Sequence, residues 1–95
     1  MTQIHKIKLN EMYCDDVLNL VKTAELRVND RDYKKGDYVI FTSVRKNDSR
    51  QPLNHPVDKV LFRITYVLSF DGLFGNGKLD YPWVLFCIKP VGELI

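Results

Sequence analysis

The sequence has few of the features that mark a membrane or secreted protein. No apolar run approaches the ~18 consecutive residues that indicate a membrane-spanning helix. The N-terminal segment, MTQIHKIKLN, mixes apolar residues with polar and basic ones and has no continuous hydrophobic stretch. A secretory signal peptide needs such a stretch. We therefore expect a protein that stays in the cytoplasm and does not enter a membrane.

Cysteine and histidine are also scarce. The chain contains two cysteines, Cys14 and Cys87, and two histidines, His5 and His55. They form no CxxC pair and no spacing typical of zinc ligands. In a cytosolic protein both cysteines are expected to be free thiols that pack in the core. The sequence thus predicts no metal site, and nothing in it indicates a cofactor.

Charge alone indicates no partner, because the formal net charge is only +2. A hydrophobic fraction of 45% and a charged fraction of 27% are those of an ordinary folded protein. The 95 residues suit one domain, residues 1–95. Basic residues nevertheless outnumber acidic ones between Arg27 and Arg50. A solvated surface of mixed charge explains such a stretch, and a nucleic-acid surface is the alternative.

Alternation of apolar and polar residues predicts most of the secondary structure. The predicted strands cover residues 5–9, 22–28, 38–44, 60–69 and 83–88. The last of these is apolar throughout, as expected of a strand covered on both faces. Residues 45–58 and 71–82 are rich in proline, glycine, asparagine and aspartate, so we expect two long loops there.

A short helix is expected over residues 11–21, with the Asn10 side chain capping its first turn. Its buried face is expected to carry Tyr13, Val17, Leu20 and Val21, which recur at helical spacing. A small antiparallel sheet with such apolar strands hides its edges most easily by curling. We therefore predict a mainly β (α+β) fold, a small β-barrel of about five strands with one short N-terminal helix.

The segment Lys22 to Tyr33 carries most of the chemistry. Within its strand, Ala24, Leu26 and Val28 share one face, which we expect to lie against the core. Glu25 and Arg27 share the other face. A surface ion pair of little consequence is the plain interpretation of that pair. The alternative is a polar site, in which Lys22 is long enough to reach Glu25.

The string ELRVNDRDYKKGD, together with the preceding VLNLVKT, resembles an ASCH domain of the PUA-like superfamily. It is most similar to an uncharacterised ASCH-like branch that is common in bacterial and phage genomes. The resemblance covers nearly the whole chain and rests on Lys22, Thr23, Glu25, Arg27 and the pair Gly36-Asp37. The chain departs from the pattern at one position, where Leu20 replaces a glycine at the end of the helix. This departure predicts a different exit from the helix, because glycine favours a left-handed cap.

The resemblance implies a PUA-like barrel with a polar cleft between helix and barrel, and a role in binding RNA or a nucleotide-like ligand. In a hydrolase branch of the family, which removes acyl groups from modified cytidine, the lysine equivalent to Lys22 assists a threonine three residues later. Here Glu25 occupies that position, which favours binding over catalysis. If the protein is such an amidohydrolase, the catalytic residues would be Lys22, Thr23 and Glu25. A phage-associated adaptor that binds another protein, through the 45–58 loop, is a third possibility.

The expected ligand-contacting residues are basic, with one aromatic and one acidic residue among them. They are Lys22, Glu25, Arg27, Arg31, Tyr33, Lys34 and Lys35. Basic side chains next to an aromatic ring suit single-stranded RNA, because the cations follow the backbone and the ring stacks on a base. The alternative is that Tyr33 packs on the core and the lysines only solubilise a turn. The glycine-rich 71–82 loop could also close over a ligand and stack Phe74 or Tyr81 on it.

Overall fold

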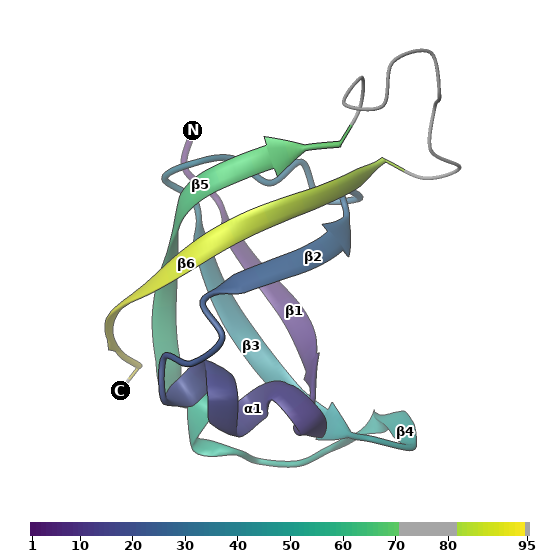
Figure 1. The fold of residues 1–95 in the computed structure, drawn as a ribbon. Helices are drawn as coiled ribbons and strands as arrows, with labels where there is room; N and C mark the ends of the chain where they lie inside the picture. Colours follow the sequence, from purple (N-terminus) through teal and green to yellow (C-terminus); the bar gives the residue numbers. More distant parts are fainter. Residues whose placement is uncertain (71–81, 95) are drawn as a thin grey trace.

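The computed structural model describes residues 1–70 and 82–94 and shows one curled sheet with a helix at one end (Figure 1). The sheet has six strands, one more than expected. In chain order the elements are β1 (Ile4–Asn10), α1 (Glu11–Leu18), β2 (Ala24–Val28), β3 (Tyr38–Arg45), β4 (Asp48–Pro52), the 3-10 helix η1 (Pro56–Lys59), β5 (Val60–Ser69) and β6 (Trp83–Glu93). The prediction of a mainly β fold with one short helix is confirmed.

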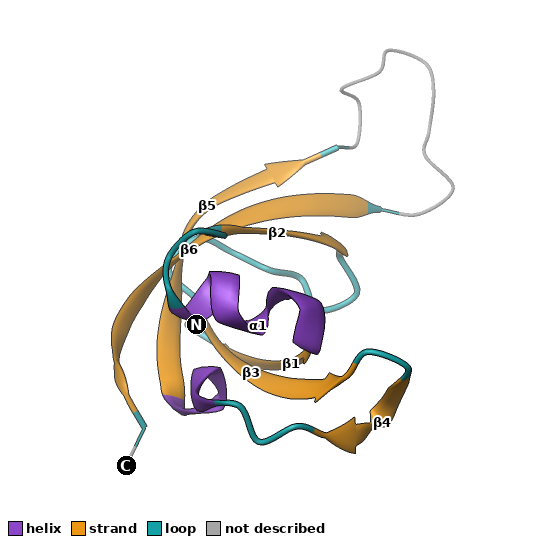
Figure 2. Ribbon diagram, turned by 60° about the horizontal axis from the view of Figure 1, so that its bottom comes forward, coloured by secondary structure: helices purple, strands orange, loops and turns teal. Residues whose placement is uncertain are grey.

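The strand order leaves the sheet as a half-barrel. It runs β1-β3-β5-β6-β2, and β4 pairs with β3 to the side of this path. Because β1 and β2 stand at the two ends of the order, no ladder of the described strands joins them. We call the opening between β1 and β2 the seam. Figure 2 shows α1 lying across one end of the half-barrel, with β2 on one side of the helix and β1 and β3 on the other.

The sheet is mixed, whereas an antiparallel sheet was expected. β1 pairs with β3 in parallel, with His5 opposite Val39 and Leu9 opposite Ser43. The other ladders are antiparallel. A parallel pair needs a long crossover, and α1, β2 and the turn after it supply one here. The periodicity of each strand carries no information about this direction.

The core fills the concave side of the half-barrel. Phe41 and Phe62 meet edge to face with their ring centroids 5.4 Å apart. Over residues 83–88 of β6 every second residue is buried, namely Val84, Phe86 and Ile88, whereas Trp83, Leu85 and Cys87 are half-buried. The strand is therefore covered more fully on one face than on the other.

The helix begins as expected and ends earlier. Asn10 accepts a hydrogen bond from the Met12 amide at 3.0 Å, which confirms the predicted cap. The helix stops at Leu18, and its buried residues are Cys14 and Val17. Tyr13 is 43% exposed and therefore does not belong to the buried face that we expected. Leu20 and Val21 lie beyond the helix and are exposed as well.

The helix exit corrects the expectation about Leu20. Leu20 has φ 62, the left-handed conformation that a glycine would adopt, so the exit is the ordinary one. The Leu20 amide donates to the Val17 carbonyl at 3.2 Å and the Val21 amide to the Asp16 carbonyl at 2.9 Å, the pair of bonds of a Schellman motif. The Lys22 amide also donates to the Asp16 carbonyl, at 3.0 Å. The motif thus fixes where Lys22 leaves the helix.

The predicted 45–58 loop contains β4, and η1 begins at its end. Polar bonds organise this segment. Asp58 accepts from the Ser43 amide at 2.7 Å and from the Ser43 hydroxyl at 3.0 Å, and that hydroxyl accepts from the His55 amide at 3.0 Å. Hydrophobic periodicity cannot reveal elements that are held in this way. The predicted 71–82 loop, with Phe74 and Tyr81, lies outside the described residues except for its last position.

The structure shows no helix with the length and apolar character needed to cross a membrane, within the residues that it describes.

Candidate binding site at the seam

The two faces of β2 are the reverse of the prediction. Glu25 is 5% exposed, whereas Leu26, expected in the core, is 53% exposed. Ala24 and Val28 are half-buried. Alternation shows which residues share a face, and the apolar set normally marks the buried one. Here the charged set faces inward, because neighbouring cations neutralise the buried carboxylate.

Glu25 holds two cationic side chains. The Lys22 ammonium donates to Glu25 Oε1 and, at 2.7 Å, to the Ala24 carbonyl. Arg27 Nε donates to Glu25 Oε2 at 3.0 Å. Each oxygen of the carboxylate therefore has its own cation. The side chains of Lys22 and Arg27 remain 29% and 24% exposed, so they are oriented by a buried group and still reach solvent.

Arg27 also crosses the seam. Its Nη2 group donates to the carbonyl oxygen of Lys8 on β1. This single side chain therefore connects the two edge strands, which no backbone ladder joins. A cleft lies on each side of it, and Lys8 and Arg27 line both clefts. We call the one that contains Tyr13 of α1 the helix-side cleft, and the one that contains Asp30 and Arg31 of the loop after β2 the loop-side cleft.

The helix-side cleft has a volume of about 470 Å³ and contains the Lys22–Glu25–Arg27 group. Asn10 and Tyr13 complete its polar lining. The Lys22 ammonium lies 5.4 Å from the centroid of the Tyr13 ring, within the range of a cation–π contact. Tyr13 was assigned to the core from its helical spacing, so the sequence did not reveal its place in the site.

The loop-side cleft has a volume of about 510 Å³ and is more basic. Lys6, Lys8, Arg27 and Arg31 line it, and Asp30 is its one carboxylate within residues 1–70 and 82–94. Trp83 of β6, Tyr33 and Thr42 also contribute. The structure thus brings the predicted Arg31 to the same seam as Arg27. Sequence reasoning missed Lys6, Lys8 and Trp83, although Lys6 and Lys8 alternate with buried residues on β1 and so were bound to share an exposed face.

Tyr33 is a core residue more than a surface one. It is 3% exposed, and its ring centroid lies 4.7 Å from those of both His5 and Phe86. Burial raises the pKa of its phenol. A ring enclosed in this way does not present a free face to a base, so the structure supports the alternative that Tyr33 packs on the core.

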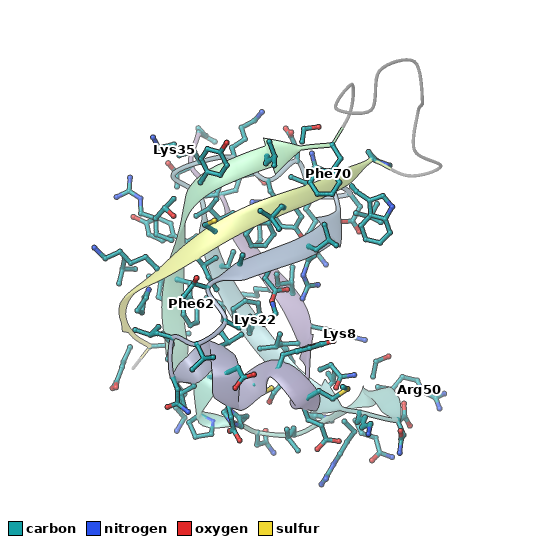
Figure 3. All side chains as sticks on the ribbon, in the orientation of Figure 1. Lys8, Lys22, Lys35, Arg50, Phe62 and Phe70 are labelled. Atoms are coloured by element: carbon teal, nitrogen blue, oxygen red, sulfur yellow. The ribbon has the colours of Figure 1, made fainter. Side chains whose placement is uncertain are left out.

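Neither Lys34 nor Lys35 is among the residues that line the two seam clefts. The Lys34 ammonium lies 3.4 Å from Asp32 in an exposed ion pair. Lys35 lines a separate depression of about 330 Å³ with Arg63 and Lys89. In Figure 3, Lys8 and Lys22 lie near α1, and Lys35 lies at the other end of the half-barrel. Lys35 and the Lys22 group therefore belong to different surfaces.

The Gly36-Asp37 pair has a structural role. Gly36 has φ 94 and makes the turn before β3. Asp37 is 3% exposed; it lies 2.8 Å from His5 Nε2 and accepts from the amides of Gln3 at 3.1 Å and Lys34 at 3.2 Å. Burial alone would raise the pKa of Asp37, but these hydrogen bonds outweigh it and lower the pKa.

Neither Thr23 nor Cys14 lines a seam cleft, so neither is placed there as a nucleophile. Thr23 is exposed and lines neither seam cleft, and its carbonyl accepts from the Ile88 amide at 2.9 Å. Burial, together with the charges of nearby acids, raises the pKa of Cys14 to about 11, so its thiol stays protonated at neutral pH. Cys14 is a buried free thiol, as expected, and Cys87 is a half-buried one.

Among residues 1–70 and 82–94, no three His, Cys, Asp or Glu side chains gather as metal ligands would.

Comparisons with known proteins place the chain in a family. An uncharacterized 12.9 kDa protein in the GpA 3' region of Escherichia phage P2 is 48% identical over 41 residues, which are 43% of this chain and 38% of that protein. The match thus spans less than half of either protein. The crystal structure of hypothetical protein PH0355 has a TM-score of 0.59 at 17% identity, and the match covers 95% of this chain and all of that one, so the two share a fold. A family model described as a domain of unknown function, DUF3850, matches residues 4–77, and the chain therefore belongs to the DUF3850 family.

Proposed function

We propose that this protein binds single-stranded RNA or a nucleotide-like ligand along the seam. The observation that carries the proposal is the composition of the two clefts. Among the described residues, their lining contains five cationic side chains, Lys6, Lys8, Lys22, Arg27 and Arg31, against the two carboxylates of Glu25 and Asp30. Aromatic rings of Tyr13 and Trp83 stand among them. Cations combined with aromatic rings suit a flexible, anionic strand whose bases are free to stack.

The arrangement of Arg27 supports binding of a phosphate. A guanidinium has five N–H donors. The bonds to Glu25 and to the Lys8 carbonyl use two of them, so three remain for a ligand within the described surroundings. Because Glu25 and Lys8 fix the group on both sides, little side-chain entropy is lost when a phosphate binds.

The helix-side cleft favours binding over catalysis. Both oxygens of Glu25 already accept from cations, and Lys22 donates to the Ala24 carbonyl as well. In the part of the chain that the structure describes, Tyr13 is the one hydroxyl-bearing residue of its lining. The kinship with ASCH domains and other PUA-like barrels is part of the same proposal, and it is supported by the string from Glu25 to Asp37 and by the half-barrel with its helix.

Binding of a short single-stranded RNA at low salt tests the proposal. Lys22→Ala combined with Arg27→Ala should weaken binding at least tenfold and reduce the dependence of affinity on salt. Each phosphate contact on a single strand contributes roughly 0.7 to the slope of log affinity against log salt, so the slope should fall by roughly 1.4. Wild-type protein that binds no RNA at low salt would refute the proposal.

A matched control removes the same charge from a different surface. Arg63 and Lys89 stand opposite each other on β5 and β6, in the depression that contains Lys35. Replacing both with alanine relieves a like-charge contact, so the fold should persist. This control should bind RNA within about twofold of wild type, since screening by salt weakens charges that do not touch the ligand. Equal losses in the two double variants would mean that only net charge matters.

The deacylase alternative has its own assay. Protein incubated with N-acetylated cytidine should give no free cytidine above the background, because Glu25 stands where the hydrolase branch has its threonine and Thr23 lines neither seam cleft. Turnover that disappears in Lys22→Ala would instead establish the enzyme and displace the binding proposal.

A further inference from the structure

We infer that the seam is built for two adjacent nucleotides, with the phosphate that links them held at Arg27. This inference rests on the proposed function and names its ligand class, a dinucleotide step within single-stranded RNA rather than one free nucleotide.

The division of the seam is the first observation. Arg27 extends from β2 to the Lys8 carbonyl on β1 and so stands between two clefts of similar volume, about 470 and 510 Å³. Each volume lies within the range of sites that take small ligands. One nucleotide fits each cleft better than it fits the whole seam, because Arg27 would have to leave Glu25 and Lys8 to join the two spaces.

The second observation is the length of the seam. On β1 the clefts extend from Lys6 to Asn10. Four residue steps along a strand correspond to about 13 Å. A stacked nucleic-acid strand advances about 3.4 Å per nucleotide. The seam is therefore long enough for at least two nucleotides in sequence.

Each cleft has a ring in its wall and cations at its border. In the loop-side cleft, Trp83 offers a surface for stacking, and Asp30 can accept from the amino group of a base. In the helix-side cleft, Tyr13 takes the corresponding place, with Lys22 beside its ring. Lys8 and Arg27, common to both clefts, are where a phosphate between two bases would lie.

The chain offers an internal probe, because Trp83 is its only tryptophan. Its fluorescence is followed while wild-type protein is titrated with a nucleoside monophosphate, a dinucleoside monophosphate and a tetranucleotide at one low salt concentration. The dinucleoside monophosphate should bind at least about fivefold more tightly than the mononucleotide, since stacking of a further base contributes roughly 5- to 150-fold in affinity. It should also quench Trp83. Lengthening the ligand from two to four nucleotides should increase the affinity much less.

The variant Arg27→Lys sharpens the test. It keeps the charge, but a lysine cannot contact Glu25, the Lys8 carbonyl and a phosphate together. It should reduce the advantage of the dinucleoside monophosphate over the mononucleotide to about threefold or less. Arg63→Ala with Lys89→Ala should leave that advantage unchanged. The wild-type length series needs no variant, so it decides the matter even if Arg27→Lys folds poorly.

The outcomes separate this inference from the proposed function. If RNA binds but affinity rises evenly with every nucleotide, or binding leaves Trp83 fluorescence unchanged, the two-nucleotide arrangement is wrong and RNA binding stands. If neither the short ligands nor longer RNA binds, the proposed function itself fails.

Discussion

Two buried carboxylates, Glu25 on β2 and Asp37 immediately before β3, are paired in different ways. Asp37 is surrounded by the ring of His5, itself 4% exposed, and by two backbone amides. Glu25 is as deeply buried, but its partners are Lys22 and Arg27, which reach solvent at the seam.

The difference indicates what each carboxylate does. The bonds of Asp37 link the N-terminal segment, β1 and the turn before β3, and they end on two backbone amides and on the buried ring of His5. The bonds of Glu25 end on side chains that a ligand can meet. Burial of a charged group is therefore not by itself a mark of function. A group that orients a binding surface is distinguished by partners that are side chains reaching solvent, as Lys22 and Arg27 do.

The largest effect on stability is expected from Asp37→Asn. The substitution keeps the shape but removes the charge and places an amide against the donors of Gln3 and Lys34. Breaking a buried pair in this way should lower the free energy of unfolding by about 3 kcal/mol. Urea denaturation measures it. Asp48→Asn is the matched control, because Asp48 pairs with Arg50 on the surface, and it should leave stability unchanged. Equal losses in both variants would contradict a special role for Asp37.

The lowered pKa of Asp37 predicts how stability changes in acid. A carboxyl whose pKa is lower in the folded state than in the unfolded state stabilises the protein at pH values above the unfolded-state pKa, which is about 4. That contribution is lost as the pH falls through the folded-state pKa. The urea midpoint should therefore fall more steeply below about pH 4 in wild type than in Asp37→Asn. Parallel curves for the two proteins would show that Asp37 contributes nothing to acid sensitivity.

A smaller effect is expected from Glu25→Gln. Lys22 and Arg27 are partly exposed and can turn to water once the carboxylate is gone. The free energy of unfolding should fall by about 1 to 2 kcal/mol, clearly less than for Asp37→Asn, in the same urea experiment. A loss of unfolding free energy as large as that of Asp37→Asn would make Glu25 a structural group and would remove the contrast between Glu25 and Asp37.

The smallest effect is expected at Leu20, which places Lys22. A left-handed conformation costs a leucine about 1 to 2 kcal/mol, and glycine avoids this at an entropic cost of about 0.5 to 1 kcal/mol. Leu20→Gly should therefore raise stability by about 0.5 kcal/mol in thermal denaturation and leave RNA affinity unchanged. Leu20→Ala, which keeps the conformational cost, should show no gain. A loss of stability in Leu20→Gly would mean that the leucine side chain itself stabilises the helix exit.

Much of the fold was predictable because its apolar residues alternate. β1, β3, β5 and β6 all begin within a residue or two of the predicted starts. The 48–52 strand was not predictable, since it is polar and pairs only with β3. Nor was the parallel pairing of β1 with β3, which depends on the path of the whole chain.

The site was predictable in part. The spacing of Lys22, Glu25 and Arg27 indicated a group in contact, and the structure shows one. The buried side of β2 was assigned wrongly, because the rule that apolar residues face the core fails where two cations neutralise an inward carboxylate. Lys8 and Trp83 come from strands distant in the sequence. Only the curl of the sheet brings β1 opposite β2, so no local pattern could place them in the site.

The affinity of Glu25→Gln for single-stranded RNA, measured at low salt beside wild type, tests the central claim most directly. The substitution makes the protein more positive, so attraction by net charge alone predicts equal or tighter binding. If Glu25 instead orients Lys22 and Arg27, binding should weaken about tenfold, equivalent to about 1.4 kcal/mol. Weaker binding by a more positive protein would support an ordered site at the seam, and equal or tighter binding would contradict it.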